Sequence, residues 1–295
     1  MHTRTRMKTI WRWAAWAIAL TLSLGAASGL ARAGAACSAH SPAHRVALVE
    51  LYSSEGCSSC PPADRWLSQL HDGSPGASIV PLELHVDYWD RLGWTDRFSQ
   101  HRFTERQENL AAFAGGHLIY TPEVFVAGRE LRDWGASDFD ARLRELAAQP
   151  AQVDVAIRLA SVTPGAASQA GGAGGRGSGV AAGVNTQALG VDAQFTARST
   201  APHTLNAYVA VYENQLSSQV DAGENRGATL HHDRVVREWL GPAPLVGGVA
   251  RIQRNVVLAA DASDTAPPGR FGVAAFVEDA ASGDVLQAAD LPACR

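Results

Sequence analysis

Positive charge is scarce in this chain, and Lys8 is its single lysine. The 25 basic residues face 29 acidic ones, which gives a formal net charge of −4 at pH 7. Proteins that bind nucleic acids or anionic lipid surfaces carry a basic patch, and an acidic chain lacks this electrostatic feature. We therefore expect no nucleic-acid partner, and we attribute the preference for arginine over lysine to base composition.

Long apolar runs are scarce as well, and one of them, Trp13–Leu30, approaches the length that spans a bilayer. Basic residues precede this run, and small residues with two A-x-A cleavage options follow it. This order is typical of a secretory signal peptide, which we assign to residues 1–36. We predict cleavage near residues 33–36 and a periplasmic or secreted protein with no remaining membrane span. A retained membrane anchor is the alternative.

Cysteine is sparse too, with Cys37, Cys57, Cys60 and Cys294 in the whole chain. Disulfides persist in the oxidising compartments that exported proteins reach. Four cysteines allow three pairings. The favoured one makes Cys57–Cys60 a working pair and Cys37–Cys294 a structural disulfide that joins the two ends. In an alternative interpretation Cys37 is a lipidated first residue, although Gly34 stands where a lipoprotein signal normally has leucine.

Two patterns of secondary structure follow the leader, and apolar residues, at 46%, suffice for one large or two medium domains. Residues 37–150 alternate strands with helices, whereas residues 151–295 contain short strands separated by turns. These patterns predict an α/β domain followed by a mostly antiparallel β-sandwich-like domain. Residues 163–187 are rich in Gly, Ala and Ser and are predicted to form a disordered loop between two strands.

The expected elements of the first half are strands at 46–52, 78–86 and 123–126, a hairpin arm at 130–132, and helices at 63–70, 96–114 and from Ser137 onward. Those of the second half are strands near 153–159, 191–197, 205–213, 230–239, 250–257, 271–277 and 284–288.

The segment GCSSC places Cys57 and Cys60 after a buried strand and before a helix. One sulfur of such a pair can attack a substrate disulfide while the other resolves the mixed intermediate. Amide groups at a helix start stabilise a thiolate. Because Pro61 and Pro62 lack amide donors, we expect the helix to begin at or after Cys60. Cys57 is the predicted nucleophile, since the earlier cysteine is usually the more exposed one.

Two other interpretations of the cysteine pair remain open. In the first, the pair is a structural disulfide and the chain is a non-catalytic secreted binding module. In the second, Cys57, Cys60 and His85 bind copper or zinc, because paired thiolates with an imidazole suit these metals. The leading hypothesis requires neither a metal nor a cofactor.

The stretch from His85 to Trp94 lies at the carboxyl end of the strand expected beside the cysteine strand, where ligands gather in open α/β sheets. His85 and Asp87 share one strand face by the two-residue period and are candidates for a proton relay. Packing is the alternative role for these residues. Three aromatic side chains are candidates for the floor of a peptide groove: Tyr88, Trp89 and Trp94.

The triplet Tyr120-Thr121-Pro122 precedes a strand, Gly128 and a last helix. Together with the strand, C-x-x-C and helix before it, this order resembles the thioredoxin superfamily, in which a Thr-Pro with a cis peptide bond faces the cysteine pair. The resemblance implies a thioredoxin-like α/β domain from residue 45 to about 149. It also implies that Thr121 offers its backbone to an extended substrate and that Pro122 shields the sulfurs from metal.

Several longer segments are similar to one bacterial secreted family, called domain of unknown function 1223. They read ELYSSEGCSSCPPAD, HVDYWDRLGWTDRFSQHRFTERQ, YTPEVFVAG and YENQLSSQVDAGENRGATLHHDRVVREW. The resemblance implies a thioredoxin-like domain joined to a β-rich one, with Glu123 standing where the family has glutamine. We therefore expect thiol–disulfide exchange on protein or peptide thiols, together with an unidentified redox partner.

Two polar groups stand out in the second half. Gly223-Glu224-Asn225 is typical of a turn, and a loop that reaches toward the thiol site is the alternative. The adjacent His231 and His232 point to opposite faces of a strand, so they cannot easily bind one metal together.

Overall fold

The computed structural model describes residues 37–70, 79–135, 137–162, 186–199, 201–202, 204–259 and 270–292, all within one compact unit. The predicted signal peptide, Cys294 and residues 163–185 of the predicted loop lie outside the described residues. Within the described part, no helix has the length and apolar character needed to cross a bilayer.

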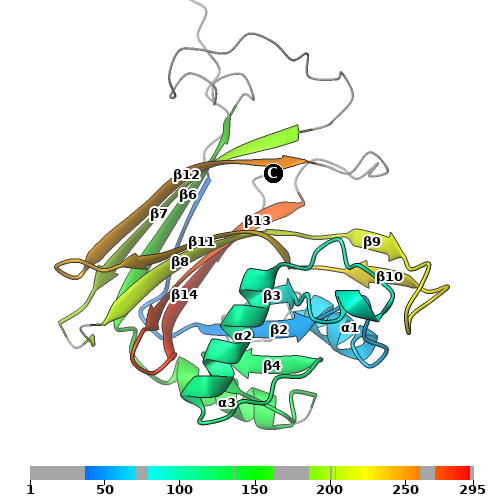
Figure 1. Ribbon diagram of the computed structural model, residues 1–295. Coiled ribbons are helices and arrows are strands. Elements are labelled where there is room, and N and C mark those ends of the chain that lie inside the picture. The colour runs from blue at the N-terminus through cyan, green and yellow to red at the C-terminus, as the bar shows by residue number, and fades with distance from the viewer. Residues whose placement is uncertain are drawn as a thin grey trace, which may run out of the picture. The chain divides into compact units, whose positions relative to one another are not determined.

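A parallel strand pair with a helix between its strands supports the cysteine segment (Figure 1). Every residue of the first strand, β2, is buried, as its continuous apolar sequence predicts. β4 pairs antiparallel with the other edge of β2 and continues into β5. The bounds are β2 Ala47–Ser53, α1 Pro61–Gln69, β3 Ile79–His85, β4 Glu123–Val126 and β5 Arg129–Glu130.

Two further helices and a short 3-10 helix complete this part of the chain. The two α-helices contribute apolar side chains to the same core as β2, β3 and β4, including Phe103, Leu110 and Leu146. The bounds are α2 His101–Phe113, α3 Ser137–Ala147 and the 3-10 helix η2 Asp90–Leu92.

Strands of the second half extend the same sheet. Its eight strands run in the order β14-β13-β8-β11-β3-β2-β4-β5, and Val235 of β11 pairs in parallel with Glu83 of β3. Residue 150 therefore marks a change of secondary-structure type and not a border between two sheets. The added strands are β8 Leu205–Glu213, β11 Val235–Pro244, β13 Phe271–Asp279 and β14 Val285–Leu291.

A second, four-stranded antiparallel sheet has the order β1-β6-β7-β12. This sheet and one face of the larger sheet form a common core, which includes Val209 and Val211 of β8. Tyr208 and Tyr212 of β8 point to the opposite face, into the core that holds the helices. β8 is thus buried on both faces, with the two-residue period of a strand. The bounds are β1 Cys37–His40, β6 Val153–Val162, β7 Thr186–Ala197 and β12 Val249–Ala259.

Two expected elements differ from the structure. The strand expected at 230–239 is divided into β10 (Thr229–His232) and β11 because Arg234 between them has a φ of 63°, which no strand adopts. β10 pairs instead with β9 (Leu216–Gln219) in a separate hairpin. The helix expected from residue 96 begins at His101, because Gln100 has extended backbone angles and the Asp96 carboxylate is hydrogen-bonded to Glu55 and His85.

Candidate functional site

The cysteine pair lies at the start of α1 and forms a disulfide with a Cα–Cα distance of 5.5 Å. Cys60 is the N-cap residue, and Pro61 and Pro62 occupy the first turn. The prediction that the helix begins at or after Cys60 is confirmed. The turn is closed by the Cys60 amide, which donates to the Cys57 carbonyl at 3.2 Å. The first amide groups of the helix, those of Ala63 and Asp64, donate to the Cys60 carbonyl at 2.8 and 3.1 Å.

Both cysteines are buried, with 0% of either residue exposed, whereas Ser58 and Ser59 between them are exposed. Cys57 is therefore no more accessible than Cys60. The sequence-based expectation was that Cys57 is the more exposed of the two cysteines. It is buried because chain segments cover the cysteine pair from two sides.

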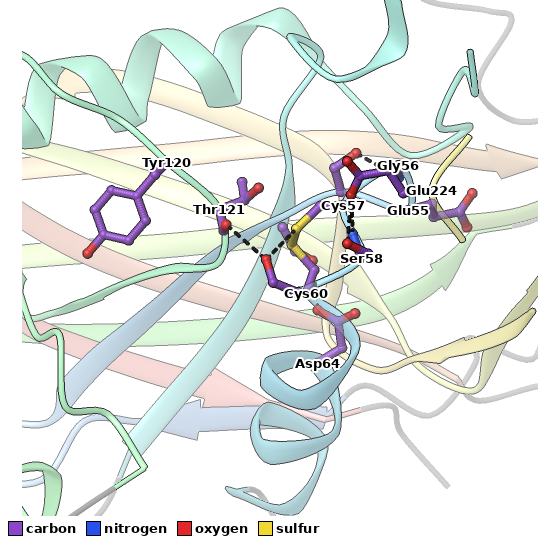
Figure 2. Close-up of a disulfide and its surroundings, with 12 residues drawn as sticks. Glu55, Gly56, Cys57, Ser58, Cys60, Asp64, Tyr120, Thr121 and Glu224 are labelled. Atoms are coloured by element: carbon purple, nitrogen blue, oxygen red, sulfur yellow. Dashed lines mark hydrogen bonds between the residues drawn. A yellow bond between two sulfur atoms is a disulfide. The ribbon is translucent and has the colours of Figure 1, made fainter. Parts of the chain in front are cut away.

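The segment Gly223-Glu224-Asn225, which we call the capping loop, covers one side of the motif (Figure 2). The Ser58 amide and hydroxyl donate to the Glu224 carboxylate at 3.0 and 2.7 Å. The side-chain amide of Asn225 donates to the carbonyls of Glu55 and Cys57, both at 2.9 Å. The structure bears out both interpretations of this triplet: the Arg226 amide donates to the Gly223 carbonyl at 3.3 Å in a turn, and the loop reaches the thiol site.

Gly223 allows the capping loop to approach Trp94 closely. Its φ is 73°, and a Cβ atom at this position would lie 3.1 Å from the Cβ of Trp94. Trp94 itself donates its indole N–H to Glu55 at 2.8 Å. Trp94 therefore supports the capping loop in addition to being a candidate for substrate contact.

The Thr121–Pro122 segment lies on the other side of the pair, and its peptide bond is cis, as the resemblance implied (Figure 2). The Ser59 hydroxyl connects it to the disulfide. This hydroxyl lies 3.3 Å from the Cys57 sulfur and donates to the Thr121 carbonyl at 3.4 Å. The structure thus brings together Cys57, Cys60, Thr121 and Pro122 at one place.

Glu123 follows this segment and is buried at the start of β4. Burial raises the pKa of its carboxyl to about 7, although a hydrogen bond from Gln107 at 2.6 Å opposes the shift. Burial likewise raises the pKa of the nearby Tyr88 to about 12. Tyr88 and Trp89 are half-buried and pack against the core, so both contribute to packing around the site.

His85 and Asp87 form hydrogen bonds with different residues. The buried His85 ring lies between Asp96, at 2.6 Å, and Glu83, at 2.9 Å. Asp87 accepts a hydrogen bond from Thr104 at 2.5 Å and lies 3.0 Å from the exposed ring of His101. The structure therefore does not bring the two proposed relay residues together. Nor does it present His85 with the cysteines as one ligand set, since both sulfurs are in a disulfide.

The profile of one family, described as "Protein of unknown function (DUF1223)", matches residues 48–278, more than half of the chain. The chain belongs to this family. The matched region of this DUF1223 protein includes the cysteine pair, the Thr121–Pro122 segment and the capping loop. A search of curated proteins finds no match.

Two solved structures resemble the DUF1223 chain. The crystal structure of protein AGR_C_4864 from Agrobacterium tumefaciens is 25% identical, with a TM-score of 0.51, and the match covers 84% of this chain and 95% of the other. HBP35 of Porphyromonas gingivalis is 13% identical, with a TM-score of 0.54 and coverage of 86% and 76%. At this level of identity the second likeness concerns the fold alone.

A buried network of acids and imidazoles lies beside the disulfide, and it was not predicted as a group from the sequence. Burial lowers the pKa of His232, but Glu83 and Glu55 raise it to about 10. Burial and the Glu83 charge raise the pKa of Asp64, in α1, to about 7. The available sequence signal was Glu83 and His85 within the otherwise apolar strand PLELHV, where each polar group requires a buried partner.

A cavity of about 600 Å³ lies away from the disulfide. Arg106, Tyr208, Trp239 and Glu278 are among its lining residues, and neither cysteine is. Arg106 is buried there between the carboxylates of Glu50, at 2.6 Å, and Glu278, at 3.0 Å. Because its guanidinium group is bonded to Glu50 and Glu278, Arg106 links α2 to β2 and β13.

Proposed function

We propose that this DUF1223 protein is an exported thiol–disulfide oxidoreductase with a thioredoxin-like catalytic segment that acts on protein or peptide thiols. The observation that carries the proposal is a disulfide-forming C-x-x-C at the N-terminus of α1 with the cis Thr121–Pro122 segment beside it. The β2-α1-β3 unit with antiparallel β4 and β5 supports the thioredoxin-like interpretation. The signal-peptide pattern at residues 1–36 supports export.

In the reducing direction, the Cys57 thiolate attacks one sulfur of a substrate disulfide. A mixed disulfide forms, and the other substrate sulfur leaves as a thiolate. Cys60 then attacks the Cys57 sulfur, which releases the second substrate thiol and restores the Cys57–Cys60 bond. Two electrons pass from the cysteine pair to the substrate, and a dithiol redox partner restores them. The same steps in reverse oxidise a substrate dithiol.

Access to Cys57 requires a movement of the chain, because neither cysteine is exposed. The capping loop contacts the motif through Glu224 and Asn225, whereas the Thr121 side has the bond from Ser59. We assign the capping loop the role of a lid that opens before a substrate sulfur reaches Cys57. Local opening of this kind is common in segments held by few partly exposed hydrogen bonds.

The test is turnover of a disulfide peptide by the wild type and by Cys57→Ser and Cys60→Ser variants. We expect Cys57→Ser to reduce turnover to the background rate. Cys60→Ser should accumulate a mixed disulfide on Cys57, because the resolving thiol is missing. Background activity of both the wild type and a variant with an opened lid would refute the proposal.

The full burial of both sulfurs favours a second candidate, a non-catalytic binding module with a structural disulfide. Structural disulfides resist reduction, whereas catalytic ones exchange readily. Normal cellular function of a Cys57→Ser/Cys60→Ser double variant would support this second candidate over the first.

A further inference from the structure

Glu83, His85 and His232 form a compact buried group at the end of β3 and on the facing β10. Their possible ligand atoms all lie within 4.8 Å of one another. The Oε1 atom of Glu83 is 2.9 Å from Nε2 of His85 and 2.9 Å from Nδ1 of His232. Each of the three residues is at most 1% exposed.

The second nitrogen of each imidazole faces another carboxylate. Nδ1 of His85 lies 2.6 Å from Asp96, and Nε2 of His232 lies 3.6 Å from Glu55. Asp96 is held in place by the amides of Glu55 and Phe98, both at 2.8 Å. A carboxylate behind each ligating histidine is the usual arrangement around protein metal ions, where it fixes the ring orientation.

The network also has unmet polar atoms and an excess of acidic groups. Four buried carboxyl groups, those of Glu55, Asp64, Glu83 and Asp96, surround two imidazoles. Among the described atoms, Oε2 of Glu83 has no hydrogen-bond partner, and Oε1 of Glu55 and Nε2 of His232 face each other at 3.6 Å, beyond hydrogen-bond distance. Buried polar atoms are rarely left in this state, and a cation at the centre supplies both a partner for Glu83 and positive charge.

We propose that Glu83, His85 and His232 bind a Zn²⁺ ion. At zinc–ligand distances of about 2.0–2.2 Å, neighbouring ligand atoms of a tetrahedral site are about 3.3 Å apart. The two separations from Glu83 to the imidazoles are 2.9 Å, and all three ligand atoms lie within 4.8 Å of one another. Nitrogen and oxygen ligands suit zinc, whereas copper(I) prefers sulfur. Asp64, whose Oδ2 lies 3.9 Å from Nδ1 of His232, is the candidate for a fourth ligand.

The site has a structural role in this arrangement. His232 ends β10, and β10 follows the capping loop in the β9–β10 hairpin. Zinc bound to β3 and β10 together fixes this hairpin beside α1 and β3, and so fixes the base of the capping loop. The proposal includes neither cysteine, so it stands or fails independently of the proposed thiol chemistry.

The experiment uses the full chain with Cys57→Ser and Cys60→Ser in every sample, so that the thiols of this pair contribute no metal binding. Elemental analysis after expression with zinc should give about one zinc per chain. The matched variants are His232→Asn and His231→Asn, because His231 is the exposed neighbour on the same strand. His232→Asn removes one ligand and should lower the zinc affinity at least about tenfold. His231→Asn should bind zinc with the same affinity as the parent.

A second measurement covers the case in which His232→Asn fails to fold. The parent chain is refolded from denaturant either with zinc or with a chelator, and its thermal unfolding is compared. Zinc should raise the midpoint, since a ligand that binds only the folded state stabilises it. Substoichiometric zinc in the parent with equal midpoints, or zinc fully retained by a folded His232→Asn variant, would overturn the proposal.

Discussion

Asn225 gives the sharpest test of the lid, because one side chain makes two measurable contacts with the cysteine motif. Its amide donates to the carbonyls of Glu55 and Cys57, both at 2.9 Å. A typical hydrogen bond contributes about 0.5–1.5 kcal/mol net to a folded state. Asn225→Ala thus removes about 1–3 kcal/mol from the free energy that keeps the capping loop closed. Since about 1.4 kcal/mol is a tenfold change in an equilibrium constant, the open population should rise about 5-fold to about 150-fold.

The assay is the rate at which dithiothreitol reduces the Cys57–Cys60 bond, followed by trapping of the new thiols. When opening precedes attack, the rate is proportional to the open population, so it should rise by the same factor. Asn109→Ala is the control, because Asn109 is an exposed asparagine on α2 and does not contact the motif. An Asn225→Ala rate within twofold of the wild-type rate would refute the assignment of the lid.

Three further predictions concern other contacts. Arg106→Ala leaves the buried Glu50 and Glu278 without their shared cation. We therefore expect the free energy of unfolding, measured in urea, to fall by about 3–5 kcal/mol. A loss below about 1 kcal/mol would contradict the structural role of Arg106. Burial raises the pKa of Glu123 to about 7, so its stabilising effect is complete below its unfolded pKa and is lost as the pH rises through 7. Glu123→Gln should therefore unfold at a higher temperature than the wild type at pH 8, and this advantage should shrink toward pH 5; an equal difference at both pH values would show that Glu123 does not titrate in this range. Gly223→Ala introduces a Cβ close to Trp94 at a positive φ. Because this should destabilise the closed capping loop, it should also accelerate reduction of the disulfide. An unchanged reduction rate would mean that the close approach of Gly223 to Trp94 is not needed for closure.

Local sequence signals predicted the elements whose cause is local. The buried run of β2 and the start of α1 at Pro61 follow from apolar continuity and from the missing amide donors of proline. His231 and His232 lie on opposite faces of β10, as the two-residue period requires.

Features that depend on distant partners were not predictable from local patterns. The delayed start of α2 follows from the backbone of Gln100 and from the bonds of Asp96 to Glu55 and His85. The pairing of Val235 with Glu83, which joins the two halves in one sheet, connects residues far apart in the chain. The capping loop is a similar case, because its residues indicate a turn and their contact with Ser58 is visible only in the folded chain.

The reduction potential of the Cys57–Cys60 bond tests the central claim most directly. It is measured by equilibrating the wild-type protein with defined ratios of reduced and oxidised dithiothreitol or glutathione, and by quantifying the thiols of Cys57 and Cys60. Catalytic pairs of this class lie between about −270 and −120 mV, whereas structural disulfides lie below about −300 mV. A value within the first range is the result that thiol–disulfide exchange requires. A value below about −300 mV, in the wild type and in Asn225→Ala alike, would contradict the account and identify the bond as structural.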